Sequence, residues 1–187
     1  MSITPTTAVR SDRARPRVVL VGPMGAGKTT VADLLAQRWG TTVRDTDSDI
    51  ETAEGRAISA IFIDEGEAYF RSREREAVAA ALGEHAGVLA LGGGAVLDES
   101  TQALLAAHVV VFLSVGFADA VKRVGLGAGR PMLLGNVRSQ VKALLDERFP
   151  IYSAVAAATV TTDDKSAEDV AAEVATVVEK LEVDQRE

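Results

Sequence analysis

The sequence of 187 residues contains no cysteine and only two histidines, His85 and His108. Without thiols it has no disulfide, no thiolate metal site and no cysteine nucleophile, and with two histidines a multi-histidine metal site is not expected. The absence of cysteine is consistent with a reducing cytoplasm, which is the location we predict. Aromatic residues make up 4% of the chain, so its core has to consist mainly of Ala, Val, Leu and Ile.

Positive charge and long apolar runs are scarce as well. The chain has 20 basic and 27 acidic residues, for a net charge of −7, so no broad cationic surface is expected. This disfavours nucleic acid and anionic membranes as partners. No stretch approaches the ~18 apolar residues of a membrane span, and residues 1–16 lack the apolar run of a secretory signal. We expect a flexible tail at 1–16, a single domain at 17–181 and a C-terminal tail at 182–187.

Within the expected domain, short apolar runs alternate with segments of helical spacing. The run RVVLV at 17–21 is short, β-branched and apolar, which is typical of a buried parallel strand. The predicted strands are 17–21, 42–47, 87–94, 108–115 and 157–162. The predicted helices are 29–39, 58–83, 101–107, 117–124, 137–155 with an interruption near Pro150, and 169–181. The alternation predicts an α/β fold whose parallel sheet is covered on both faces and binds ligands at the carboxyl ends of its strands.

The strongest motif is GPMGAGKT, which runs from Gly22 to Thr29 between a predicted strand and a predicted helix. It matches the phosphate-binding loop pattern of Gly, four residues and Gly-Lys-Thr. Its glycines let backbone N–H groups point at a phosphate, and the helix N-terminus adds partial positive charge. In such loops the lysine, here Lys28, reaches the β- and γ-phosphates, and the hydroxyl of Thr29 ligates Mg²⁺. The motif predicts a nucleotide site but not the fate of the phosphate.

Three further segments could determine that fate. RDTD places Asp45 and Asp47 at a predicted strand end. One of these carboxylates could hold Mg²⁺ through water, and the other could accept a proton from an attacking hydroxyl. Alternatively, both are turn or helix-capping carboxylates. LGGGAV places the glycines Gly92–Gly94 after a buried strand, either to let a ligand approach the backbone or as a plain tight turn. GAGRPMLLG places Arg130 in a glycine-punctuated loop, either as part of a lid over the phosphates or as a solvated side chain.

The segment IFIDEGEAYFRSRE, residues 61–74, sets Arg71 among carboxylates. On a helix, Arg71 would lie one turn after Glu67 and one turn before Glu74. One interpretation is a solvated surface helix, in which such pairs contribute only ~0.2–0.5 kcal/mol each. Whether Arg71 has another role depends on the rest of the chain.

Together these motifs resemble those of the shikimate kinases, over residues 17–181. The resemblance rests on six segments in the family's order: GPMGAGKT, RDTDSDIE, FIDEGEAYFRSRE, LGGGAV, GRPMLL and ERFPIY. The phosphate loop is shared by many unrelated enzymes, whereas the Phe-Arg pattern combined with the triple glycine is far more specific. The resemblance implies a three-layer α/β/α fold with a five-stranded parallel sheet, a helical substrate-binding segment at about 46–75 and a mobile lid at about 125–136.

The resemblance also implies a reaction, in which a monomer with Mg²⁺ as cofactor transfers the γ-phosphate of ATP to the 3-hydroxyl of shikimate, on the route to chorismate and the aromatic amino acids. The implied catalytic residues are Lys28, Asp47, which positions or deprotonates the attacking hydroxyl, and Arg130, which closes over the phosphates. Asp45 would support Mg²⁺ through water, with Thr29 as the direct ligand. The implied ATP-binding residues are Gly25, Ala26, Gly27, Lys28, Thr29, Thr30, Arg123, Arg130 and Lys165. The implied substrate-binding residues are Asp47, Arg71, Gly92, Gly93, Gly94 and Arg148, with Arg71 and Arg148 on the substrate carboxylate.

Two positions depart from the family pattern. In TTDDKSAED, Lys165 and Ala167 stand where the family often has an arginine and then a proline near the adenine. Lysine can lie over a base but lacks guanidinium stacking.

Two other functions stay open at this point. One is a different small-molecule kinase of the same fold, acting on gluconate or a nucleoside monophosphate, which has no evident need for the Asp-Thr-Asp, Phe-Arg and triple-glycine set. The other is a non-catalytic nucleotide-binding protein, which would be expected to have lost Lys28, Asp47 or Arg130.

Overall fold

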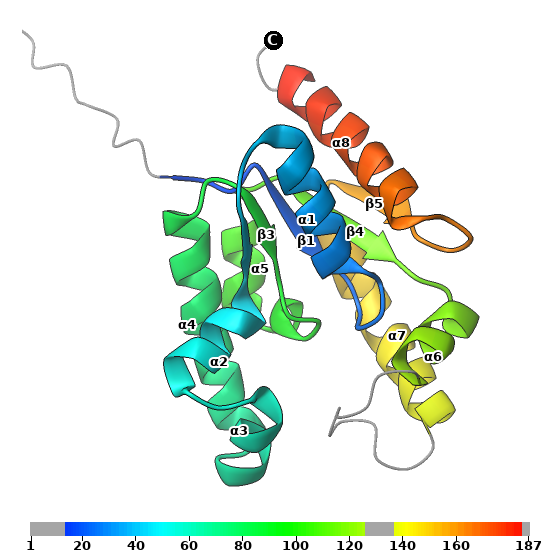
Figure 1. Cartoon of the computed structure of the whole chain (residues 1–187). Coiled ribbons are helices and arrows are strands. Elements are labelled where there is room, and N and C mark those ends of the chain that lie inside the picture. The colour runs from blue at the N-terminus through cyan, green and yellow to red at the C-terminus, as the bar shows by residue number, and fades with distance from the viewer. Residues whose placement is uncertain (1–13, 126–136, 185–187) are drawn as a thin grey trace, which may run out of the picture.

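The computed structural model describes residues 14–125 and 137–184 (Figure 1). The predicted lid at about 125–136, with Arg130, therefore lies almost wholly outside the described residues, as do residues 1–13 of the predicted N-terminal tail. The described chain forms a five-stranded parallel sheet with helices on both faces, which confirms the predicted fold class. None of the helices in the described ranges combines the length and the apolar character of a membrane-spanning helix.

The sheet has the strand order β2-β3-β1-β4-β5. Its strands are β1 (Val18–Val21), β2 (Val43–Asp45), β3 (Val88–Ala90), β4 (Val110–Ser114) and β5 (Ala158–Thr161). All four residues of the central strand β1 are buried, as its uninterrupted apolar sequence predicts. After β1, the next two strands along the chain, β2 and β3, lie on one side of β1, and the last two, β4 and β5, lie on the other side. The carboxyl ends beside β1 therefore form the crevice in which open α/β sheets bind ligands.

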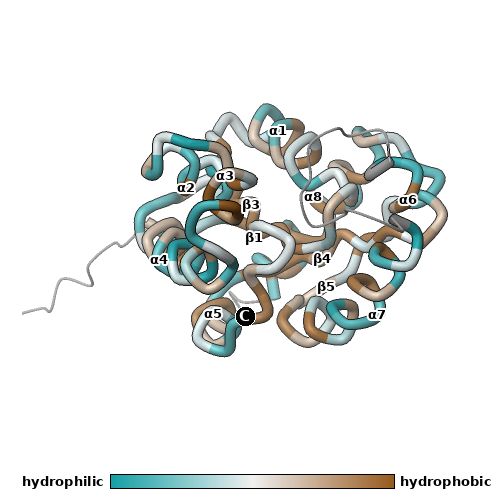
Figure 2. The backbone as a smooth tube through the Cα atoms, turned by 90° about the horizontal axis from the view of Figure 1, so that it is seen from below, coloured by the Kyte–Doolittle hydropathy of each residue, from teal (hydrophilic) through white to brown (hydrophobic). Residues whose placement is uncertain are grey.

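The helices cover the sheet as two layers. They are α1 (Lys28–Trp39), α2 (Thr46–Glu54), α3 (Ile58–Asp64), α4 (Glu67–Glu84), α5 (Glu99–Leu105), α6 (Phe117–Gly125), α7 (Val137–Val155), α8 (Ala167–Asp184) and the 3₁₀ turn η1 (Ala95–Leu97). Successive residues of β1 face opposite sides. Val18 and Leu20 pack with α1 and α8, whereas Val19 and Val21 pack with α4, α5 and α7. Figure 2 shows the hydrophobic strands between these layers.

A third, smaller core lies outside the sheet. It joins Ile50 of α2, Ile61 of α3 and Phe70 of α4, and the rings of Phe62 and Phe70 lie 4.7 Å apart. These three helices therefore pack on one another, and α2, α3 and the first half of α4 form the segment predicted to bind substrate.

Two helix predictions were wrong in detail. The predicted helix at 58–83 is two helices, α3 and α4, because Gly66 between them takes a φ of 85° that interrupts the helical path. The interruption expected at Pro150 does not occur, and α7 runs unbroken from Val137 to Val155. Proline removes one helical hydrogen bond, but Phe149 and Tyr152 on either side of it both pack on the ring of Phe112 in β4 and hold the helix on the sheet.

At the amino-terminal edge of the sheet, Arg17 joins three segments. Its guanidinium lies over the ring of Trp39, at 4.1 Å from the ring centroid, and donates to both carboxylate oxygens of Glu182 at 2.8 and 3.0 Å. Trp39 ends α1 and Glu182 lies near the end of α8. This junction thus ties the start of β1 to the far ends of the two helices that cover one face.

Candidate active site

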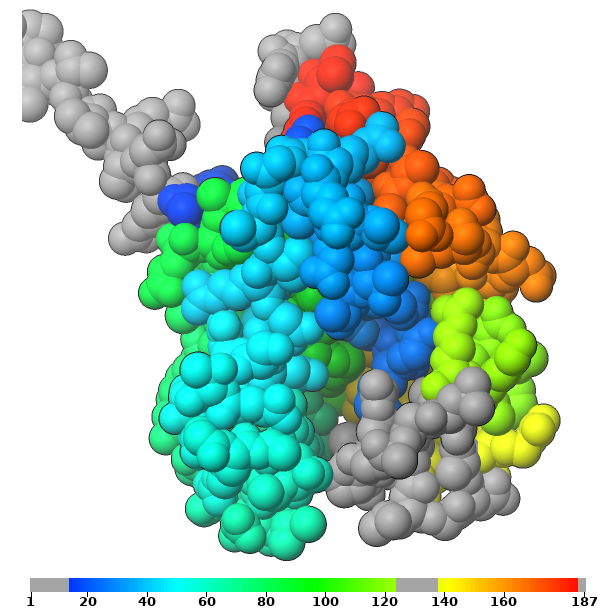
Figure 3. Space-filling view, viewed as in Figure 1, coloured from blue at the N-terminus to red at the C-terminus, as the bar shows by residue number. Residues whose placement is uncertain are grey.

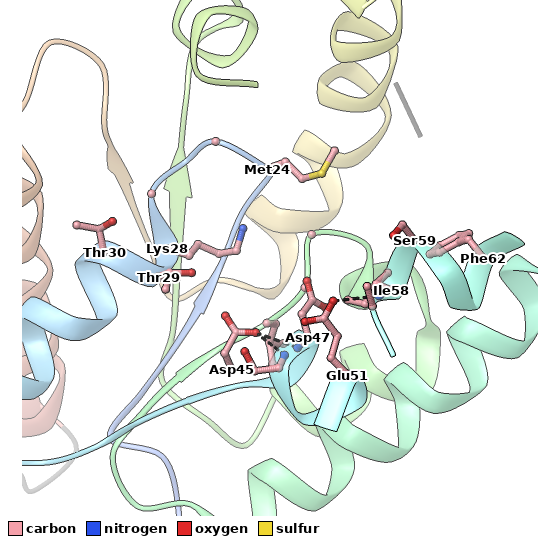
Figure 4. A pocket seen from close by; sticks show the side chains of 17 residues that line it. Met24, Lys28, Thr29, Thr30, Asp45, Asp47, Glu51, Ile58, Ser59 and Phe62 are labelled. Atoms are coloured by element: carbon pink, nitrogen blue, oxygen red, sulfur yellow. Dashed lines mark hydrogen bonds between the residues drawn. The ribbon is translucent and has the colours of Figure 1, made fainter. Parts of the chain in front are cut away.

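A pocket of about 610 Å³ opens at the carboxyl ends of the strands beside β1. It is lined by the phosphate loop after β1, the junction of β2 and α2, one face of α3, and the glycine loop after β3. Figure 3 shows α2 and α3 as a lobe beside the phosphate loop, with the surface hollowed between them. Figure 4 shows the side chains that face this space. The pocket thus lies where the predicted fold puts ligands.

The phosphate loop has the conformation that its glycines allow. Gly25 and Gly27 have φ values of 80° and 86°, and Gly27 caps the first turn of α1. Lys28 folds back over the loop, and its Nζ donates to the carbonyl oxygens of Gly22 and Pro23 at 2.7 and 3.0 Å. Thr29 and Thr30 follow on the pocket wall. The loop therefore presents a lysine, two hydroxyls and a helix N-terminus to one space, which is the chemistry that a polyphosphate requires.

Asp45 caps helix α2 and also lines the pocket. Its Oδ1 accepts from the backbone N–H of Asp47 at 2.9 Å and of Ser48 at 3.3 Å. The helix-capping interpretation of Asp45 is therefore confirmed, and it does not conflict with a role toward a ligand, because the same carboxylate faces the pocket (Figure 4).

Asp47 is the most perturbed carboxyl group of the pocket. Burial, the largest cause, and the nearby carboxylates of Asp45 and Glu74 together raise its pKa to about 6, and the ammonium of Lys28 opposes that rise. Its Oδ1 is buried and has no hydrogen-bond partner among the described residues. A buried carboxylate oxygen without a partner is costly, so this atom is suited to a donor that a ligand brings.

The glycine loop Gly92–Gly94 makes room for charged side chains. A Cβ on Gly92 would collide with Oδ1 of Asp47, and a Cβ on Gly94 would collide with the guanidinium of Arg71. A Cβ on Gly93 would lie 3.7 Å from Nη1 of Arg148. The structure therefore brings together, around this loop, the three charged residues that the resemblance assigns to the substrate.

Arg71 forms the ion pairs that its sequence position predicts, but not on an open surface. Its Nη1 lies 2.7 Å from Oε2 of Glu74, and its Nη2 lies 3.4 Å from Oε1 of Glu67. The side chain of Arg71 is 18% exposed and that of Glu74 only 4%. Burial raises the pKa of Glu74, and the Arg71 guanidinium opposes that rise. The pairing is thus confirmed, whereas the solvated position that the simpler interpretation needs is not.

Arg148 comes from α7 on the other side of the glycine loop. It is 6% exposed, and its Nε has no hydrogen-bond partner among the described residues. A buried guanidinium that keeps an unused donor is suited to an anionic ligand.

A second, smaller hollow of about 180 Å³ lies on the other side of the phosphate loop. Arg123, Lys165 and Ala167 line it together with the loop. Nη1 of Arg123 donates to the carbonyl of Gly25 at 3.0 Å and to the hydroxyl of Thr162 at 3.1 Å, while Nζ of Lys165 pairs with Glu173 at 2.5 Å. The residues expected near the base of ATP thus line one hollow, and the side chain of Lys165 is paired with Glu173 of α8.

Three residues that were not predicted as part of the site make specific contacts in this region. Thr46 and Tyr152 are buried and bind the backbone of the glycine loop, and Glu51 lines the pocket while accepting from the N–H of Ile58 at 2.9 Å. All three lie in quoted motifs, Thr46 and Glu51 in RDTDSDIE and Tyr152 at the end of the Arg-x-x-x-Tyr motif, one helical turn after Arg148.

The pocket suits Mg²⁺ bound together with a nucleotide. The described residues contain no group of three or more acidic or histidine side chains that could enclose a metal ion. Mg²⁺ does not need one, because it keeps several waters and takes one or two protein oxygens along with substrate phosphates. Thr29 and Asp45 both line the pocket beside the phosphate loop and offer such oxygens.

Comparisons with known proteins agree with one another. A family model described as Shikimate kinase matches residues 24–179. The shikimate kinase of Salinispora arenicola is 60% identical over 163 residues, which cover 87% of this chain and 98% of that protein. That of Streptomyces coelicolor is 59% identical over 155 residues, covering 83% of this chain and 91% of the relative.

Solved structures give the same result. The shikimate kinase of Acinetobacter baumannii, in complex with shikimate, superposes with a TM-score of 0.85 at 35% identity, over 89% of this chain and 94% of the other. The shikimate kinase of Aquifex aeolicus has a TM-score of 0.74 at 29% identity, over 89% and 98%.

Proposed function

The chain belongs to the shikimate kinase family, and from this premise we propose how its residues divide the transfer of the γ-phosphate of ATP to the 3-hydroxyl of shikimate. The chain is a kinase that uses ATP and acts on shikimate. The observation that best supports our assignment of roles is the buried Oδ1 of Asp47, which has no hydrogen-bond partner in the described part of the chain and lies in a pocket that also contains Lys28.

On the acceptor side, Arg71 and Arg148 bind the carboxylate of shikimate. Both guanidinium groups lie against the glycine loop and are mostly buried, so that a carboxylate between them would form charge-assisted hydrogen bonds sheltered from water. The backbone at Gly92, Gly93 and Gly94 faces the same substrate. Glu74 holds Arg71 in place, and its negative charge keeps that arginine from being an uncompensated buried cation.

Asp47 acts on the hydroxyl that attacks. Its Oδ1 accepts the hydrogen bond of the 3-hydroxyl and takes up the proton as the bond to phosphorus forms. With a pKa raised to about 6, Asp47 is mostly ionised at neutral pH yet is a better proton acceptor than an ordinary aspartate. Positioning and proton acceptance thus fall to one atom.

On the donor side, the backbone of the phosphate loop carries the phosphates. Gly25, Ala26, Gly27 and the residues Lys28–Thr30 surround them, and Lys28 leaves the carbonyl oxygens of Gly22 and Pro23 to reach the transferred group. Arg123 and Lys165 border the base. Arg130, outside the described residues, stays a prediction as the arginine that closes over the β- and γ-phosphates.

Mg²⁺ would be held by the hydroxyl of Thr29 and, through water, by Asp45. When bound, the ion neutralises charge that develops on the phosphates during transfer. Asp45 is already fixed by its hydrogen bonds to the N-terminus of α2, so its outer oxygen is well placed to hold a water. We also propose that the enzyme works as a monomer in the cytoplasm.

A coupled assay of ADP release tests this function. Turnover should require shikimate and should be far slower with gluconate or nucleoside monophosphates as acceptors. Nucleotide binding without turnover on any of these acceptors would contradict the proposal and favour a non-catalytic nucleotide-binding protein.

A further inference from the structure

The glycine loop has to be held from outside, because it has no side chains of its own. Three consecutive glycines have more backbone freedom than any other tripeptide. A loop that samples many conformations would present its N–H groups to a substrate only part of the time, which weakens binding. The question is therefore which groups restrain Gly92–Gly94.

The first restraint acts on Gly92. Its N–H donates to Oγ1 of Thr46 at 3.2 Å, and Thr46 is fully buried at the start of α2. Thr46 lies between Asp45 and Asp47, so the same turn that places the two carboxylates also holds the first glycine.

The second restraint acts on Gly93. The hydroxyl of Tyr152 donates to the carbonyl oxygen of Gly93 at 2.5 Å. Tyr152 is 1% exposed, and its ring lies against Phe112 with 5.0 Å between the ring centroids. Burial raises the pKa of Tyr152 to about 12, so the hydroxyl keeps its proton and stays a donor at any physiological pH.

This bond fixes a whole peptide unit. In a trans peptide the carbonyl and the following N–H point in opposite directions. Because Tyr152 holds the carbonyl of Gly93, the N–H of Gly94 has to point away from the tyrosine. Tyr152 also follows Arg148 by one turn of α7, so one helix sets both the peptide and the arginine.

We propose that Tyr152 is a positioning residue for shikimate, which fixes the peptide after Gly93, and that Thr46 supports it at Gly92. The inference rests on the proposed function of the pocket and adds two residues that do not touch the reacting atoms. A purely structural role for the Tyr152 hydroxyl would affect stability alone. A positioning role affects the use of shikimate by enzyme that is fully folded.

Tyr152→Phe removes only the hydroxyl, and the chain offers a matched control. Its other tyrosine, Tyr69, also donates its hydroxyl, to Glu54 at 2.9 Å, but it does so away from the glycine loop. We expect Tyr152→Phe to raise the KM for shikimate about tenfold, the effect of losing one buried hydrogen bond. The Kd for ATP should stay within twofold of wild type, and Tyr69→Phe should leave both constants unchanged.

Hydrogen exchange of the peptide that contains Gly92–Gly94 gives a second measurement. It should become faster in Tyr152→Phe and stay the same in Tyr69→Phe. A Tyr152→Phe enzyme with the shikimate KM and the exchange rate of the control would overturn the inference, whatever its melting temperature.

Thr46→Val keeps the test decisive if Tyr152→Phe does not fold. It removes the hydroxyl that holds Gly92 and should also raise the shikimate KM, by about three- to tenfold. An unchanged KM in a folded Thr46→Val enzyme would overturn the inference. Wild-type enzyme that fails to phosphorylate shikimate would instead refute the proposed function, so the two failures are distinguishable.

Discussion

The two glycine-rich loops of the pocket use glycine for different reasons. In the phosphate loop, Gly25 and Gly27 have positive φ, and no atom of the described residues lies within 4 Å of a Cβ added to Gly27. In Gly92–Gly94 no residue has a positive φ, yet a Cβ on Gly92 or Gly94 would collide with Asp47 or Arg71. Gly25 and Gly27 are therefore needed for the backbone conformation, whereas Gly92 and Gly94 are needed for space.

This difference separates two ways of building a site. On the donor side, the phosphate loop is one continuous segment whose glycines allow its conformation, and Arg123 and Lys165 border it. The acceptor side is assembled from α2, α4, α7 and the loop after β3, and its shape depends on buried side chains that hold one another. A change on the donor side that leaves Lys28 in place should therefore alter the KM for ATP, and a change on the acceptor side the KM for shikimate.

Loss of Lys28 is expected to have the largest effect. Lys28→Ala should lower kcat about a thousandfold or more, because the transferring phosphoryl group loses its closest cation. The measurement is ADP release with both substrates saturating, on protein whose circular dichroism matches wild type. Near-normal turnover would remove Lys28 from the mechanism.

Asp47→Asn should lower kcat/KM for shikimate by about a hundredfold or more, because the amide cannot accept the proton of the hydroxyl. Assays of initial rate at varied shikimate concentration measure this effect.

The Asp47→Asn variant should also be more stable than wild type near pH 7. The pKa of Asp47 is raised from 3.8 to about 6 in the folded state. Above pH 6, ionisation of Asp47 therefore lowers the free energy of unfolding of wild type by up to about 3 kcal/mol. This gain should shrink as the pH falls through 6 and vanish below about 4, which denaturant titration at several pH values can measure.

The pH dependence of wild type provides an independent test of Asp47. At saturating ATP, kcat/KM for shikimate should fall below a midpoint near pH 6, where Asp47 becomes protonated. A midpoint near pH 4, the value of an ordinary aspartate, would contradict a proton-accepting role.

Arg71→Lys should impair the use of shikimate by about ten- to a hundredfold. Lysine keeps the charge beside Glu74 but not the planar pair of donors, and such a contact is worth roughly 1.5–3 kcal/mol. The melting temperature and the ATP affinity should stay close to wild type. Full catalytic efficiency would return Arg71 to a merely structural ion pair.

Two alanine substitutions, one in each glycine-rich loop, test whether the loops serve different substrates. Each should raise the KM for one substrate by about tenfold. Gly94→Ala should displace the guanidinium of Arg71 and raise the KM for shikimate, with the KM for ATP unchanged. Gly27→Ala should do the reverse, because alanine at a φ of 86° costs about 1–2 kcal/mol and distorts the loop around the phosphates. If both variants affected the same substrate, the proposed division of the pocket would be wrong.

The sequence predicted the parts of the molecule that are local. The five strands, the phosphate loop and the helical pairing of Arg71 with Glu74 each depend on a few neighbouring residues. The convergence of Asp47, Arg71 and Arg148 was predicted only through the family resemblance. It depends on contacts such as Thr46 with Gly92 and Tyr152 with Gly93, which are 46 and 59 residues apart.

Two further features could not be predicted because distant packing overrides local preference. Pro150 locally favours an end to the helix, but Phe112 of β4 holds the residues on both sides of it. Glu74 is a charged helical residue, a type that is usually exposed, and only the fold shows that it is buried against Arg71.

The stacked pair of Arg17 and Trp39 also has a spectroscopic consequence. Trp39 is the only tryptophan of the chain, and α1, about 18 Å long for its 12 residues, separates it from Lys28 at the other end. Tryptophan emission therefore reports the junction of β1, α1 and α8 rather than the pocket. Its wavelength should stay constant when ATP or shikimate binds and shift to the red only when α8 detaches, which makes it an unfolding signal free of ligand contributions.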